Sequence, residues 1–167
     1  MGGLVGVIVH GMHVEALEWE MNMWGVPPRH MGRIPAGILA AIRMSASCVV
    51  FGTGASERKG RKEAEVIVEY MFANFPRLSE FSAFSEFSQE NLAHIEYVMG
   101  QKLHTETTSR NTVEEIRAAF RIFVAKHITR AVHVSSQTHI SRCIRDGCAV
   151  SRESEFDGKI KIGRAHV

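Results

Sequence analysis

The segment HTETTSRNTVEE, residues 104–115, concentrates polar side chains that folding alone does not require. The hydroxyls of Ser109 and Thr112 can donate hydrogen bonds to the oxygens of a phosphate, carboxylate or ribose group, and Glu106 can act as a general base. Asn111 and Thr112 have a second interpretation, in which they fix a turn and cap the helix that follows. The segment therefore predicts part of a ligand site, with helix capping as an alternative or additional role.

Three other predicted strand ends carry small or polar residues. Gly52 and Gly54 in GTG would let a backbone approach an anion closely, but the third glycine of a dinucleotide fingerprint and the lysine of a P-loop are missing. In an open parallel sheet such ends meet at one edge, where helix N-termini offer free N–H groups to a ligand. The residues at these three ends are His10, Gly11 and His13, then Gly52, Thr53 and Gly54, then Ser135, Ser136, Gln137 and Thr138.

His139 is the candidate for acid–base chemistry beside Glu106. It lies near the start of a predicted helix, whose dipole lowers the pKa of the imidazole and leaves a neutral base near pH 7. Arg142 follows on the same helix face and, with Arg33, can hold Glu106 ionised. A packing or capping role is the alternative for His139, and neutralisation of buried carboxylates is the alternative for Arg142.

A metal centre and a serine nucleophile are weaker hypotheses. His10 and His13 form H-x-x-H on a loop near His139, but no cysteine accompanies them, so no metal is predicted. The chain has no G-x-S-x-G segment and no suitably placed aspartate, which argues against a Ser–His–Asp hydrolase.

Apolar runs and helical periodicities alternate along the chain. The runs LVGVIVHG, SCVVFGTG and RAVHVSS predict strands that are covered on both faces, and a further strand is expected within 95–105. This alternation predicts an α/β fold, a Rossmann-like, doubly wound and mostly parallel sheet flanked by helices. Helices are predicted over 34–44, 61–72, 112–127 and 137–146.

Local signals mark the ends of some of these elements. Thr112 and Glu115 have the spacing of a capping box, and Gly147 is the predicted residue just past the last helix, before a strand that begins at 148–150. Phenylalanines at 81, 84 and 87 predict an insertion that packs as a short helix.

Composition is that of one ordinary folded domain. The 167 residues are 45% hydrophobic, and 20 basic side chains against 18 acidic ones argue against a nucleic-acid partner. Three cysteines without a C-x-x-C motif favour reduced thiols in the cytoplasm. No apolar run reaches the length of a membrane span. The Met- and Trp-rich loop before Arg33 has three alternative interpretations: it fills a core, it stacks on a purine, or it forms a homodimer contact.

The last residues are set apart from the domain. IGRAHV, residues 162–167, resembles the translation of a sequencing adapter, so we expect a single domain over 1–161 that is incomplete at its C-terminal end. The tail is therefore expected to contribute nothing to the fold.

Several segments together resemble the SanA/ElyC/YdcF family, a domain of unknown function with a Rossmann-like fold. The resemblance rests on VHG, on Arg33 in MGRIP, on GTGAS followed by KEAE, on TETTSRNTVEE and on VSSQTHISRC, and spans roughly residues 4 to 150. The loop between Gly11 and Arg33 and the Phe-rich insertion depart from the family pattern. The resemblance implies cytoplasmic or envelope-associated proteins, some with nucleotide-like ligands such as S-adenosylmethionine. It implies a polar cluster at Arg33, Glu63, Glu106, Ser109, Asn111, Thr112, His139 and Arg142.

Two functions follow as hypotheses. The first is a small-molecule enzyme, hydrolytic in its simplest form, that acts on a nucleotide- or phosphate-bearing substrate with His139 or Glu106 as base. The second is a non-catalytic module that binds S-adenosylmethionine or a related nucleotide. Glu63 contacts the ligand in either case, or is an ordinary acidic residue of a first helical turn. The expected ligand-binding residues are Gly11, Arg33, Gly52, Thr53, Gly54, Glu63, Ser109, Asn111, Thr112, Ser135, Ser136 and Arg142.

Overall fold

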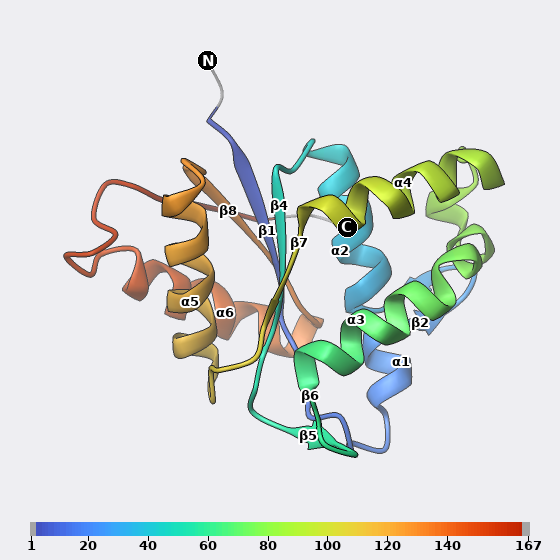
Figure 1. Cartoon of the computed structure of the whole chain (residues 1–167), viewed down its shortest axis with the longest axis horizontal. Coiled ribbons are helices and arrows are strands. Elements are labelled where there is room, and N and C mark those ends of the chain that lie inside the picture. Colours follow the sequence, from blue (N-terminus) through green and yellow to red (C-terminus); the bar gives the residue numbers. More distant parts are fainter. Residues whose placement is uncertain (1–2, 165–167) are drawn as a thin grey trace.

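The computed structural model describes residues 3–164. Its centre is a five-stranded sheet in which all neighbouring strands are parallel, in the order β7–β4–β1–β8–β9 (Figure 1). The predicted α/β class with a parallel sheet is thereby confirmed. The strands are β1 (Val5–Val9), β4 (Cys48–Gly52), β7 (Leu103–Glu106), β8 (Arg130–Val134) and β9 (Lys161–Arg164).

The central strands β1 and β4 are buried along their whole length. Val7 and Val9 of β1 face one hydrophobic core, whereas Ile8 faces a second core on the opposite side together with Val50 of β4. Continuous β-branched runs suit this position because neither face of the strand meets water.

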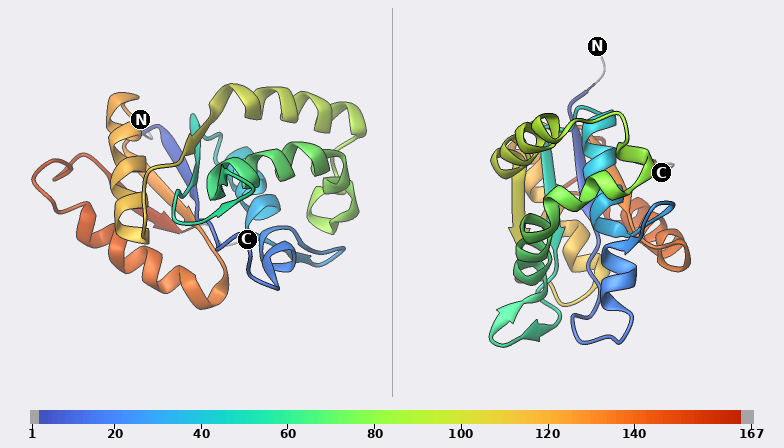
Figure 2. Two further views of the ribbon diagram at one scale, coloured as in Figure 1. Left: turned by 60° about the horizontal axis from the view of Figure 1, so that its bottom comes forward. Right: turned by 90° about the vertical axis from the view of Figure 1, so that its right-hand side faces the viewer.

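Helices cover both faces of the sheet. In Figure 1, α5 and α6 lie on one side of the strands and α2, α3 and α4 on the other, and Figure 2 shows the same layers from two further directions. Within residues 3–164 no helix has the length and apolar character needed to cross a bilayer. The helices are α1 (Trp19–Met23), α2 (Arg33–Arg43), α3 (Glu63–Asn74), α4 (Gln89–Lys102), α5 (Thr112–Ala125) and α6 (Gln137–Val150).

Smaller elements extend the face that α2 and α3 cover. Two short 3-10 helices, η1 (Phe75–Glu80) and η2 (Ser82–Phe84), confirm the helical character predicted for the Phe-rich insertion. Phe81 and Phe84 are fully buried there. Two hairpins project near the carboxyl edge of the sheet: β2 (Gly25–Val26) with β3 (His30–Met31), and β5 (Glu57–Arg58) with β6 (Arg61–Lys62).

The strand expected within 95–105 begins later than predicted. Residues up to Lys102 belong to α4, and β7 starts only at Leu103. The helix begins at a reciprocal cap between Ser88 and Asn91 and buries Leu92 and Met99 two turns apart.

The predicted end of the last helix at Gly147 is wrong, as is the strand predicted at 148–150. α6 continues through Gly147 to Val150. A Cβ atom at position 147 would lie 2.8 Å from Nε2 of His133 and 2.9 Å from Cδ1 of Ile162. Gly147 is therefore a packing position inside the helix.

Gly147→Ala is expected to lower the free energy of unfolding by about 1–3 kcal/mol, because the added methyl overpacks the buried His133 ring. Gly100→Ala in α4 is a matched control, since its methyl would meet only Cζ of Phe72 at 3.9 Å. That control should gain roughly 0.5–1 kcal/mol from the better helix propensity of alanine. Urea denaturation measures both changes, and equal effects would contradict the packing role.

The tail departs from expectation in part. Residues 161–164 form β9, which pairs in parallel with β8, and Ile162 packs against the core under α5 and α6. Residues 162–164 therefore take part in the sheet, and the adapter-like origin of the tail stays a prediction. Residues 165–167 lie outside the described part of the chain.

Candidate functional site

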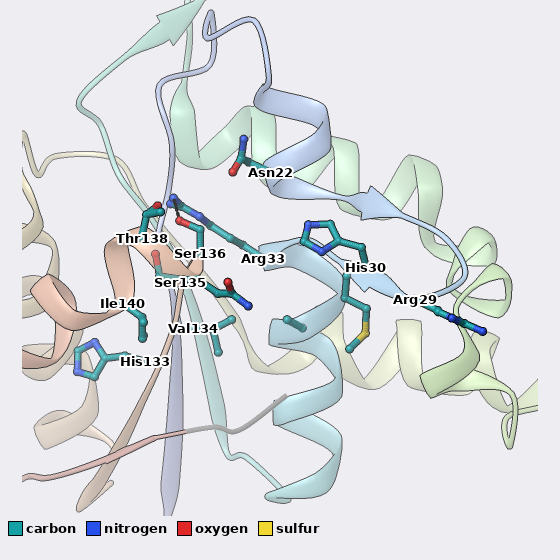
Figure 3. Close-up of a pocket in the computed structure, with 14 residues that line it drawn as sticks. Asn22, Arg29, His30, Arg33, His133, Val134, Ser135, Ser136, Thr138 and Ile140 are labelled. Carbon is teal, nitrogen blue, oxygen red and sulfur yellow. Dashed lines mark hydrogen bonds between the residues drawn. The ribbon is translucent and has the colours of Figure 1, made fainter.

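The sheet reverses its winding direction between β1 and β8. The chain leaves β1 through α2 towards β4 on one side, whereas α5 carries it back across to β8 on the other. A cavity of about 540 Å³ lies at this point, between α2, the β2–β3 hairpin and the start of α6 (Figure 3). Ligands bind open parallel sheets in such a crevice. The lining residues are Asn22, Arg29, His30, Met31, Gly32, Arg33, Ala36, His133, Val134, Ser135, Ser136, Gln137, Thr138 and Ile140.

The cavity wall is basic or neutral. Arg29 and His30 of the hairpin and Arg33 of α2 line it, and none of its lining residues within 3–164 is Asp or Glu. Gln137 and Thr138 contribute the first turn of α6, where backbone N–H groups have no carbonyl partner inside the helix. These donors and the positive end of the helix dipole favour an anion.

Arg33 joins the cavity to the end of β1. Its guanidinium donates hydrogen bonds to the backbone oxygen of His10 at 3.1 Å, to the backbone oxygen of Gly11 and to Oγ of Ser136 at 3.0 Å. The residue is only 7% exposed, and burial lowers the pKa of its guanidinium. Arg33 thus connects the loop after β1 to the loop after β8, as a residue predicted for the site.

Ser135 and Ser136 also lie where the sequence placed them. Both follow β8 and line the cavity, and Ser136 is the N-cap residue of α6. Oγ of Ser135 and Nε of Arg33 are buried, and neither has a hydrogen-bond partner among the described residues. Two polar atoms on residues of one cavity wall are therefore left unsatisfied by the protein.

A buried chain of hydrogen bonds lies behind this cavity, under α5 and α6. Nδ1 of His10 is 2.9 Å from Oε2 of Glu115, and Nε2 of His10 is 2.8 Å from Nδ1 of His133. The three residues are at most 2% exposed. Both ring nitrogens of His10 are paired in this network, whereas Oε1 of Glu115 and Nε2 of His133 are buried without a hydrogen-bond partner among the described residues. Burial of polar groups is costly unless they are paired, so the network is only partly satisfied.

The network is electrically neutral near pH 7. Burial, followed by the charge of Arg33, lowers the pKa of His10 to about 3, and burial lowers the pKa of His133 to about 3 as well. Burial raises the pKa of Glu115 to about 8. A protonated Glu115 then donates to Nδ1 of His10, whose Nε2–H donates to Nδ1 of His133.

This network was not predicted from the sequence, apart from naming His10 at a strand end. One signal was present: His133 occupies an inner position of RAVHV, and a histidine inside a fully covered strand needs a partner. Glu115 was interpreted only as a capping residue. The structure corrects this, because the N-cap of α5 is Asn111, whose side chain accepts a hydrogen bond from the N–H of Glu114.

Glu63 is buried at the first turn of α3, close to Glu115. Its carboxylate accepts a hydrogen bond from the hydroxyl of Ser56, and a Cβ atom on Gly11 would overlap its Oε1. Burial raises the pKa of Glu63 to about 7, despite the opposing hydrogen bond from Ser56, and the charge of Glu115 adds to the rise. Glu63 is thus a buried acid that titrates near neutral pH and lies outside the cavity lining.

The polar loop after β7 is closed by hydrogen bonds between its own residues, from Glu106 to Ser109. Oε1 of Glu106 accepts hydrogen bonds from the N–H and hydroxyl of Thr108, and Oε2 accepts them from the N–H and hydroxyl of Ser109. Burial opposes ionisation, but the bonds from Ser109 and Thr108 outweigh it and lower the pKa of Glu106. Ser109, Asn111 and Thr112 do not line the cavity. The geometry favours a structural role here: loop closure by Glu106 and helix capping by Asn111.

The glycines after β1 and β4 serve internal packing. A Cβ atom added at Gly52 would lie 2.7 Å from Oε1 of Glu115. A Cβ atom added at Gly54 would lie even closer to the backbone oxygen of Thr107. The hydroxyl of Thr53 accepts a hydrogen bond from the N–H of Ala55. Gly11 and Gly52 thus make room for the carboxyl groups of Glu63 and Glu115, and Gly54 makes room for the backbone of Thr107. All of these residues, with Thr53, lie outside the cavity lining.

His139 and Arg142 occupy different environments. The ring of His139 is half-buried and contacts the ring of His10 edge-on, with centroids 6.3 Å apart. Burial, followed by the charge of Arg33, lowers the pKa of His139, which is the predicted direction but has burial and nearby charges as its causes in place of the helix dipole. Arg142 is exposed, pairs with Asp146 at 3.4 Å and is not among the residues that line the cavity with Arg33.

No group of three His, Cys, Asp or Glu side chains within residues 3–164 is arranged to hold a metal ion. No protein-family model, no curated protein and no solved structure matches the chain. The chemistry of the cavity and of the buried network is therefore the basis for a function.

Proposed function

We propose that this protein binds a small phosphate-bearing molecule, with the phosphate in the cavity between α2 and α6. The observation that carries the proposal is a carboxylate-free cavity at the switch point of a parallel sheet, with Arg33 in its wall. Arg33 and the free N–H groups at the start of α6 are the donors that recognise phosphate oxygens.

S-adenosylmethionine is the second candidate ligand, and the resemblance to the SanA/ElyC/YdcF family is its main support. Membership of that family is itself a proposal, with which the Rossmann-like arrangement of the sheet agrees. The lining argues for phosphate, because a sulfonium or ammonium group would face Arg29 and Arg33 with no carboxylate among the lining residues within 3–164.

Thr138→Glu tests this proposal. The new carboxylate lies in the first turn of α6, where it favours the helix by about 0.3–1 kcal/mol but repels an anion in the cavity. The parent protein is screened for a rise in melting temperature with orthophosphate, nucleoside phosphates and sugar phosphates. We expect the compounds that raise it to have no such effect on Thr138→Glu. S-adenosylmethionine serves as the cationic comparison in the same screen.

Thr112→Glu is the matched control for Thr138→Glu. It places the same charge in the first turn of α5, beside the loop that the sequence predicted as a ligand site, and outside the cavity lining. Phosphate binding should persist in this variant. Loss of binding in Thr112→Glu, with retention in Thr138→Glu, would move the site to the loop after β7 and overturn the proposal.

Hydrolysis of the bound phosphate compound is the second candidate function. It is favoured by the position of His139, which follows the lining residue Thr138 in the first turn of α6 but is not itself in the cavity lining, and by the lowered pKa of its half-buried imidazole, which favours the neutral form that can take a proton from water. His139→Gln should then reduce turnover by about 100-fold or more while ligand affinity changes little. Product analysis of every ligand found in the thermal screen measures this, and unchanged turnover in the variant would exclude His139 as the base.

A cytoplasmic location and a homodimer are further proposals. Cys48, Cys143 and Cys148 are free thiols, which is usual in a reducing compartment. Leu17, Met21 and Val26 are exposed apolar side chains on the Trp-containing segment that the sequence linked to a dimer contact. Size-exclusion chromatography with light scattering tests the dimer.

A further inference from the structure

The cavity has a second wall, of different chemistry from the first. Met31 of β3, Ala36 of α2, Val134 of β8 and Ile140 of α6 line it with apolar side chains from four separate elements. Binding of a bare phosphate ion requires none of them. An apolar lining opposite a few polar groups is the usual pattern of a site for an organic molecule.

Part of the apolar lining lies to one side of the proposed phosphate donors. Ser136, Thr138 and the guanidinium end of Arg33 lie together in Figure 3, and Val134 and Ile140 lie to one side of that group. Val134 is 4% exposed and belongs to the hydrophobic core, so its place in the wall is fixed by the packing of β8 against α2. The anion and the carbon part of a ligand would therefore occupy different ends of one cavity.

The size of the cavity supports the same division. Its volume of about 540 Å³ exceeds what a phosphate ion fills and falls within the range of sites for organic ligands, roughly 300–1,000 Å³. We propose that the ligand is a phosphate monoester with an apolar substituent, whose phosphate binds at Arg33 and the start of α6 and whose substituent packs on Met31, Ala36, Val134 and Ile140. This inference rests on the proposed phosphate site and adds the class of the attached group.

Three probes separate the contributions: orthophosphate, glycerol 3-phosphate and phenyl phosphate. The two esters carry the same anionic group but differ in whether the attached carbon part is polar or apolar. Isothermal titration calorimetry on the full chain should show phenyl phosphate binding at least about tenfold more tightly than glycerol 3-phosphate, because its ring leaves water for an apolar wall.

Ile140→Asn removes one apolar side chain from the wall without touching the phosphate donors. The preference for phenyl phosphate should fall to about threefold or less, with orthophosphate affinity unchanged. Ile122→Asn is the matched control, since Ile122 is also partly buried, on α5, outside the cavity lining. It should retain the full preference.

The outcomes distinguish the two proposals. Equal affinities for the two esters in the parent protein, or equal weakening of all three probes by Ile140→Asn, would overturn the apolar-substituent inference while leaving a phosphate site in place. Failure of all three probes to bind would overturn the phosphate site itself, and this inference with it.

Discussion

Arg33→Met is expected to lower the free energy of unfolding by about 3–5 kcal/mol. Methionine keeps much of the apolar volume of the side chain but donates no hydrogen bond. The backbone oxygens of His10 and Gly11 and the hydroxyl of Ser136 would each lose a donor inside the protein. Unsatisfied buried acceptors cost about 1–3 kcal/mol each, which accounts for the size of the effect.

Two further variants make the Arg33 prediction specific. Arg33→Lys keeps the charge, but a single ammonium group cannot reproduce the planar set of donors, so about half of the loss should remain. Arg43→Met, at the exposed end of the same helix, should change stability by less than about 0.5 kcal/mol. Guanidinium denaturation of the three variants measures these differences. A loss below about 1 kcal/mol for Arg33→Met would show that Arg33 does not hold the two loops together.

Glu115→Gln is expected to stabilise the protein at alkaline pH, by about 4–5 kcal/mol at pH 9. The folded state raises the pKa of Glu115 from 4.5 to about 8. Such a group contributes stability that is fully present below pH 4.5 and is lost as the pH rises through about 8, because the unfolded chain ionises first. Glutamine cannot ionise, and its amide can donate to Nδ1 of His10 in place of the protonated carboxyl group. The variant should therefore nearly match the parent protein near pH 5, exceed it increasingly between pH 5 and pH 8, and keep that advantage above pH 8.

Glu106→Gln is the control, because the stability that Glu106 contributes is expected to change with pH in the opposite direction to that of Glu115. Hydrogen bonds from Ser109 and Thr108 outweigh burial and lower the pKa of Glu106, so its contribution is present above pH 4.5 and lost as the pH falls. This substitution should destabilise the protein at pH 7 and pH 9. Urea denaturation of both variants at pH 5, 7 and 9 is the measurement. A large loss for Glu115→Gln at pH 7 would mean that Glu115 and His10 form a buried ion pair instead of a neutral network.

Much of the fold was predictable because it depends on runs of one residue type. VGVIV and CVVFG are apolar at every position, and only strands covered on both faces bury all of them. The errors came from glycine and from helix ends. Gly147 was interpreted as a helix stop, although it is glycine because the His133 ring occupies the space of its Cβ atom.

The candidate site was predictable only where chain order alone decides position. Ser135 and Ser136 follow a strand and Arg33 opens a helix, so all three reach the carboxyl edge of a parallel sheet. The network of His10, His133 and Glu115 depends instead on register. β1 and β8 pair Ile8 with His133, which points the His133 ring to the same face as His10, and no local pattern in the sequence states that pairing.

The most direct test of the phosphate site is the amide spectrum of the protein during titration. In a ¹⁵N–¹H NMR titration with phenyl phosphate, the amide signals of Gln137 and Thr138 should shift most, with saturation and without change in the loop from Thr107 to Thr112. Shifts centred on Thr108 and Ser109, or no saturable shift at Gln137 and Thr138, would contradict a phosphate site between α2 and α6.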